Sequence, residues 1–151
     1  MTKNIFDQKV SSEIIERINH LTPNSAPKWG KMGAAEMLAH CNVTYEYVYD
    51  NKYREPNAMI KLILKLFVKN LVVSDKPYKH HSQTAPDFII KGDRDFEKEK
   101  TRLVDFISKT QQLGEGHFDG KKSHSFGVLN KTEWNNMFYK HLDHHLQQFG
   151  V

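Results

Sequence analysis

Apolar residues recur at every third or fourth position in five segments of this chain, which is the spacing of one face of an α-helix. In the first segment, Phe6, Val10, Ile14 and Ile18 follow one another at intervals of four residues. Strand-like patterns are limited to one short apolar run at residues 88–90. We therefore predict helices over five ranges, which are 6–20, 33–50, 57–72, 94–113 and 131–149.

This order of elements predicts an all-α fold. The four longer helices are expected to form a four-helix bundle, with the third, shorter helix in a crossover connection. Asn130 and Glu133 form a capping-box pair at the start of the last helix. Pro77 and Pro86 indicate an extended loop over residues 74–93. Three glycines mark the connection between the last two helices, Gly114, Gly116 and Gly120.

Length and composition limit the class of protein. The 151 residues fit one domain spanning residues 1–151. A content of 38% hydrophobic and 26% charged residues is typical of an ordered globular chain. The formal net charge of +4 is too small to indicate nucleic-acid binding by itself. We therefore expect a globular protein without a nucleic-acid partner.

The same composition bears on location. Cys41 is the only cysteine, so no intramolecular disulfide can form, and a reducing, cytoplasmic location is expected. The first ten residues lack the apolar core of a secretion signal. Lysines interrupt the longest apolar stretch, so no stable membrane insertion is expected; these are Lys61, Lys65 and Lys69. As a basic amphipathic helix this stretch can also bind a membrane surface or an acidic ligand, although a solvated face is the simpler interpretation.

Histidine is the unusual residue of this chain, with nine copies. His141 and His145 are four positions apart on the last predicted helix, so both side chains lie on one face, one turn apart. This is the spacing that lets two imidazoles from one helix bind one metal ion. A helical wheel puts both beside the apolar face and turns His144 further toward solvent.

The predicted helix over residues 33–50 repeats the arrangement, because His40 also lies at the edge of its apolar face. Two packed helices of this kind can bring His40, His141 and His145 to one point. Three histidine ligands leave coordination positions open, as in catalytic rather than structural metal sites. The alternatives are a solvated, histidine-rich C-terminus and a His40 that is merely a hydrogen-bonded boundary residue.

Two further residues are candidates for catalysis. Glu36 lies one turn before His40 and can orient a ligand or act as general base; alternatively, it is a carboxylate favoured by the helix dipole. His124 precedes an aromatic-glycine loop and can approach the metal as a proton shuttle; alternatively, it only holds that loop.

Several strings of the sequence together resemble one of the bacterial families of unknown function in the DinB-like superfamily. They are WGKM at 29–32, EMLAHC at 36–41, DKP at 75–77, TAP at 84–86, HSFGVL at 124–129, EW at 133–134 and YKHLDHHLQQFGV at 139–151. The resemblance implies a four-helix bundle with a divalent metal ion held by one histidine of the second helix and two of the last. At matching positions these are His40, His141 and His145. The superfamily includes transferases and isomerases that use low-molecular-weight thiols.

The expected function is that of a metal-dependent enzyme whose metal activates water or a thiol toward a small-molecule substrate, as a hydrolase or a thiol-dependent transferase. The histidine ligands suit a divalent transition metal, zinc or nickel first and iron next. A non-catalytic metal-binding or small-ligand-binding protein is the alternative, and a membrane-surface module built on the basic helix is the third hypothesis. A homodimer remains open.

Overall fold

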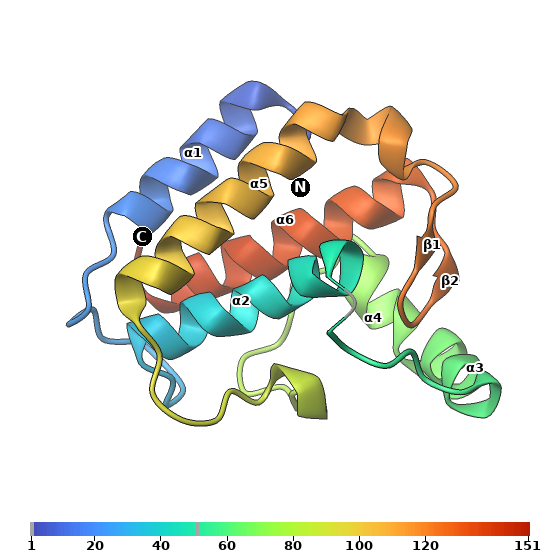
Figure 1. Ribbon diagram of the computed structural model, residues 1–151, viewed down its shortest axis with the longest axis horizontal. Helices are drawn as coiled ribbons and strands as arrows, with labels where there is room; N and C mark the ends of the chain where they lie inside the picture. The colour runs from blue at the N-terminus through green and yellow to red at the C-terminus, as the bar shows by residue number, and fades with distance from the viewer. Residues whose placement is uncertain (1, 51) are drawn as a thin grey trace.

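Figure 1 shows the computed structural model, which describes residues 2–50 and 52–151. The described chain is mainly helical, as the sequence predicts. Its helices are α1 (Gln8–Asn19), α2 (Ala34–Tyr49), α3 (Ala58–Phe67), α4 (Lys69–Val73), α5 (Phe96–Phe118) and α6 (Lys131–Gln148), with a 3-10 turn at Pro86–Phe88. Its strands, β1 (Lys122–Ser123) and β2 (Gly127–Val128), pair in an antiparallel hairpin.

The four longer helices, α1, α2, α5 and α6, lie alongside one another, and α3, α4 and the hairpin gather at one end (Figure 1). Aromatic side chains from several helices meet in their shared core. Phe138 of α6 stacks on Tyr45 of α2 with ring centroids 5.1 Å apart, and Phe118 of α5 packs edge-on at 5.4 Å. Burying a large apolar side chain contributes about 1.5–3 kcal/mol, so this core fixes the relation between α2 and α6.

The predicted helix over residues 57–72 is broken at Val68 into α3 and α4. The break follows from what each piece contacts. Lys140 of α6 donates hydrogen bonds to the carbonyls of Leu71 and Ser74 at 2.8 and 2.7 Å, and Asn136 donates to the carbonyl of Val73 at 2.9 Å. Side chains of α6 thus satisfy carbonyls at the end of α4. Within the described chain no side chain of α3 is buried.

The helix predicted to end at residue 113 continues to Phe118. Gly114 has φ +74° and ψ 168°, so it interrupts the helical backbone without ending α5. A positive φ is accessible to glycine at little cost, and here the glycine makes a kink. The turn beyond the kink carries Phe118 into the core, where it stacks on Phe6 at 5.3 Å.

Two short segments also differ from expectation. The short apolar run at residues 88–90 forms no strand, and Phe88 instead ends a 3-10 turn within the predicted loop. The hairpin of β1 and β2 was not predicted, because strands of two residues show no alternating pattern. No helix of the described residues has the length and apolar content needed to cross a membrane.

A buried ion network joins α2 to α5. Glu46 is nearly inaccessible and accepts hydrogen bonds from Arg102 at 2.5 Å, Tyr53 at 2.9 Å and Lys52 at 3.1 Å. Burial opposes the ionisation of this carboxyl, but the hydrogen bonds prevail and hold the pKa of Glu46 below its ordinary value. Arg102 also pairs with Glu99 at 2.9 Å, so one guanidinium ties both carboxylates together.

Candidate metal centre

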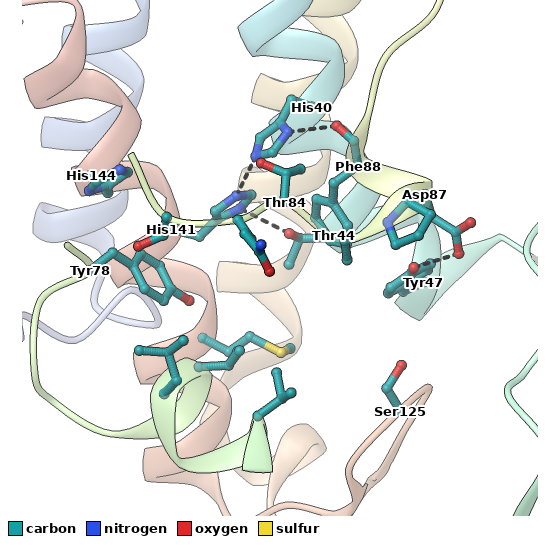
Figure 2. A pocket seen from close by; sticks show the side chains of 18 of the residues that line it. His40, Thr44, Tyr47, Tyr78, Thr84, Asp87, Phe88, Ser125, His141 and His144 are labelled. Atoms are coloured by element: carbon teal, nitrogen blue, oxygen red, sulfur yellow. Dashed lines mark hydrogen bonds between the residues drawn. The ribbon is translucent and has the colours of Figure 1, made fainter. Parts of the chain in front are cut away.

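Helices α2 and α6 bring three histidines to one point. His40 lies on α2, and His141 and His145 lie one turn apart on α6. One ring nitrogen from each lies within 4.8 Å of the other two. Nε2 of His40 and Nε2 of His141 are 3.0 Å apart. A dashed line marks this contact in Figure 2. The structure therefore brings together the three residues selected from their helical positions, in a geometry that can hold a metal ion.

Each of the three rings has an oxygen atom beside its other nitrogen. Nδ1 of His40 lies 2.9 Å from the backbone carbonyl of Phe88, and Nδ1 of His141 lies 2.9 Å from the Thr44 hydroxyl (Figure 2). Nδ1 of His145 lies 2.8 Å from the side-chain carbonyl of Gln148. Histidines that bind metals are usually oriented by such oxygen partners, which fix the tautomer of the ring.

Two of these partners determine where the proton sits. A backbone carbonyl only accepts, so Nδ1 of His40 carries the proton and Nε2 keeps its lone pair. The Gln148 amide donates from Nε2 to the carbonyl of Trp29 at 2.7 Å, which turns its carbonyl oxygen toward His145. Nε2 of His145 is therefore also unprotonated. The Thr44 hydroxyl can accept from His141, so all three rings are compatible with the tautomer that binds a metal through Nε2.

Burial keeps the cluster uncharged. Loss of solvent lowers the pKa of His40, brings that of His141 well below its ordinary value and lowers that of His145 to about 3. The neighbouring imidazoles add to the lowering for His141 and His145, because a second positive charge at such short distance is unfavourable. The cluster thus offers neutral nitrogen donors at neutral pH, a donor set that suits zinc, nickel and iron(II).

The histidines lie on the wall of a cavity of about 670 Å³. Its walls come from α2, α3, α4, α6, the loop before α5 and the β hairpin. Near the histidines the wall includes polar groups such as Thr44 and Tyr78 (Figure 2). Other parts of the wall are apolar, among them Leu64 of α3 and Leu71 of α4. A volume of this size accommodates a small molecule.

Of the two candidate catalytic residues, His124 lines the cavity and Glu36 does not. His124 lines the cavity, stacks on Tyr47 at 4.0 Å and has Nδ1 2.9 Å from the Ser125 hydroxyl. Its Nε2 is buried without a hydrogen-bond partner among the described residues. Glu36 is half-buried on α2 and is not among the residues that line the cavity. The catalytic roles of both residues stay predictions.

His144 takes no part in the histidine cluster. It is half-buried beside the rings of Trp29, Tyr78 and His80, at centroid distances of 5.9, 5.6 and 6.0 Å. The helical wheel correctly separated it from His145, but its neighbours are aromatic side chains as well as solvent.

Sequence reasoning missed the oxygen partners of the rings. One of them follows from helical spacing, since Gln148 is three residues after His145. Thr44, four residues after His40, lies on the same face of α2 as that residue, but its hydroxyl pairs with His141 of α6, a contact that spacing within one helix does not predict. The Phe88 carbonyl left no signal in the sequence, because a backbone atom in an irregular loop has no residue preference. Its position depends on the path of the loop before α5.

Comparison with known proteins corrects one expectation. The model of a family described as "Protein of unknown function (DUF1569)" matches residues 5–150, whereas no comparison places the chain in the DinB-like superfamily. That assignment rested on short strings of the sequence, among them WGKM and YKHLDHHLQQFGV, and the family model that matches residues 5–150 does not support it. No curated protein matches the chain, and no solved structure does. Because the matching model covers nearly all of the chain, this protein belongs to the DUF1569 family.

Proposed function

We propose that this protein binds one divalent transition metal ion through His40, His141 and His145, and that it is a metal-dependent enzyme acting on a small molecule in the adjoining cavity. The observation that carries the proposal is the pairing of every Nδ1 with an oxygen atom. This pairing directs the remaining nitrogens at one point, where a metal ion would replace the hydrogen bond between Nε2 of His40 and Nε2 of His141. Zinc or nickel is the preferred ion, followed by iron.

The ligand count bears on the reaction. Three protein ligands leave coordination positions open toward the cavity, the arrangement of catalytic metal sites. A bound metal ion supplies Lewis-acid chemistry, which polarises a substrate group or makes water or a thiol a better nucleophile. The reaction class that fits is hydrolysis or thiol-dependent transfer.

We also infer that α1, α2, α5 and α6 constitute a four-helix bundle, which their side-by-side arrangement supports.

Proton transfer is assigned to His124 rather than to Glu36. His124 lines the cavity, its ring stacks on Tyr47 and its Nδ1 lies beside the Ser125 hydroxyl. Its Nε2 is buried without a partner among the described residues, so the proposed proton transfer requires the ring to turn toward the cavity. An imidazole held in this way can accept a proton from a substrate or return one to it. Glu36 would have to reach the same space from a position outside the cavity wall.

The test is a screen of metal-free and metal-reconstituted protein against esters, amides and electrophiles offered with a small thiol. Turnover is expected only with metal. His124→Asn should keep the metal and lower turnover about a hundredfold, the usual scale for a general base, while Glu36→Gln leaves turnover near that of the unchanged protein. A loss in Glu36→Gln but not in His124→Asn would reverse the assignment. Tight metal binding without turnover would favour a non-catalytic metal-binding protein.

A further inference from the structure

Helix α3 presents an apolar surface to solvent. Met59, Leu62, Leu66 and Phe67 are 74, 57, 64 and 78% exposed, and Ile63 is 49% exposed. These residues lie on one side of the helix, because at about 100° per residue they fall within a single arc. Scattered exposed apolar residues are ordinary, but five on one side of a ten-residue helix form a continuous patch.

The side of α3 next to this patch faces the cavity. Leu64 and Ile60, which is still 46% exposed, line the cavity next to the metal centre, so α3 is a wall of that cavity. Lys61 and Lys65 lie on the remaining side of the helix, between the apolar patch and the side that lines the cavity. Lys65 is exposed, and Lys61 pairs with Glu55 at the edge of the apolar patch. An apolar face bordered by lysines is the pattern of helices that lie in the plane of a membrane surface.

Positive charge is concentrated around this helix. Residues 52–79 hold seven lysines and arginines and only two acidic residues, whereas the rest of the chain has more acidic than basic side chains. The hairpin adds Lys122, a largely exposed cation, to this region. Its Nζ lies 3.5 Å from a carboxylate oxygen of Glu55, the residue that also pairs with Lys61. The exposed apolar patch therefore lies in the basic part of the molecule.

We propose that α3 docks this protein on an anionic lipid bilayer, with its apolar side in the interface and its lysines at the lipid phosphates. The charge argues against a second copy of the chain as the occupant. A symmetric dimer through α3 would place the same basic region of each copy against the other. A bilayer that contains anionic lipids attracts this region and buries the patch. The metal centre is not required for this docking.

The test is co-sedimentation of the full chain with vesicles of phosphatidylcholine alone and with vesicles that also contain phosphatidylglycerol. We expect binding to the anionic vesicles that weakens as salt is added. Leu66→Glu should lower the binding constant at least about tenfold, because it removes apolar area and adds a charge of the wrong sign. Lys65→Glu should lower binding to anionic vesicles as well.

The matched control is Ile89→Glu. Ile89 is 55% exposed and lies outside α3, so this variant has the same change in charge and in apolar area away from the patch. It should bind vesicles like the unchanged protein. A Phe67→Trp variant adds a direct readout, since a tryptophan at this position should be quenched by brominated lipid.

Three outcomes would overturn the proposal. One is a failure of the unchanged protein to sediment with anionic vesicles. Another is an equal loss of binding in Ile89→Glu and Leu66→Glu, which would indicate general charge attraction without α3. The third is a concentration-dependent dimer, seen by light scattering, that Leu66→Glu dissociates while vesicle binding is absent. That result would assign the patch to a second copy of the chain.

Discussion

At the scale of single residues, the site depends on where protons sit. The Phe88 carbonyl and the Gln148 side chain can only accept from the rings they face, so the nitrogens turned to the centre of the cluster keep their lone pairs. The ring of His141 differs, because the Thr44 hydroxyl can either accept from its Nδ1 or donate to it. In the metal-free cluster Nε2–H of His141 can therefore donate to Nε2 of His40, 3.0 Å away, and a bound metal ion would replace that hydrogen bond.

The Thr44 hydroxyl provides a test of this positioning. Thr44→Val removes the oxygen 2.9 Å from Nδ1 of His141 and keeps the shape of the side chain. We expect metal affinity to fall about 10- to 100-fold, the usual cost of losing such a partner. Competition with a zinc chelator measures the affinity. Thr44→Ser restores the hydroxyl and should restore the affinity, and equal affinities in the two variants would show that the hydroxyl does not orient the ring.

Neighbouring histidines on α6 provide a second test. His145→Ala should release the metal, whereas His144→Ala should retain it, because His144 packs against the His145 ring at 5.1 Å but has no ring nitrogen among those that converge in the cluster. Metal analysis of the two purified variants makes the comparison. Retention in His145→Ala with loss in His144→Ala would show that the wrong neighbour has been assigned as the ligand.

The sequence was sufficient to predict that these three histidines lie together and insufficient to predict what holds them. His40, His141 and His145 were found because helical geometry converts spacing into position. The Phe88 carbonyl and the cavity wall were not found, because irregular loops have no periodicity from which their paths can be worked out. The wall residue Tyr78 lies in such a loop.

At the scale of elements, polar contacts between helices add to the aromatic core that joins α2, α5 and α6. The main helices were predicted from apolar spacing, but the break at Val68 and the kink at Gly114 were not, because both depend on what the flanking turns contact. Glu46 and Arg102 form an ionic contact between α2 and α5, next to the buried hydrogen bonds from Asn42 to Glu99. A buried carboxylate of this kind is costly if its partner is removed.

Arg102→Met tests the contact between α2 and α5. We expect the free energy of unfolding to fall by about 2 kcal/mol, less than for a fully unpaired buried charge because Lys52 and Tyr53 still bind Glu46. Urea denaturation measures the change. Arg94→Met, at an exposed position just before α5, is the control and should cost little. Equal losses in the two variants would contradict a specific role for the network.

The pKa of Glu46 adds a pH dependence to the same contact. Its folded-state pKa lies below the ordinary value, so the contribution to stability is complete above about pH 4.5 and is lost as the pH falls through the folded-state pKa. The difference in unfolding free energy between Arg102→Met and the unchanged protein should therefore shrink below pH 4.5. A difference independent of pH would contradict an ionic contribution.

At the scale of the whole molecule, the three uncharged histidines beside the cavity couple the stability of the fold to their protonation and to metal binding. Their folded-state pKa values lie below the value of about 6.5 expected in an unfolded chain. The unfolded chain therefore binds more protons than the folded chain below that pH. Metal binding requires the same unprotonated nitrogens, so acid disfavours both the fold and the metal complex.

Stability of the metal-free protein should consequently be complete above about pH 6.5 and fall as the pH decreases toward the folded-state values. Each histidine that stays neutral while folded contributes about 1.4 kcal/mol per pH unit across that window. Urea midpoints at pH 7.5 and pH 5.5 measure the fall. His145→Gln removes one such group, whose folded-state pKa is about 3, and should make the fall shallower. An unchanged slope would contradict the burial of a neutral His145.

The central claim is that His40, His141 and His145 together hold one metal ion. The most direct measurement is the ratio of metal to protein, by elemental mass spectrometry, in chain purified without an affinity tag and in the variant with all three histidines replaced by alanine. We predict about one zinc, nickel or iron ion per chain and none in the triple variant. An equal metal content in both proteins, or none in either after incubation with each metal, would contradict the claim.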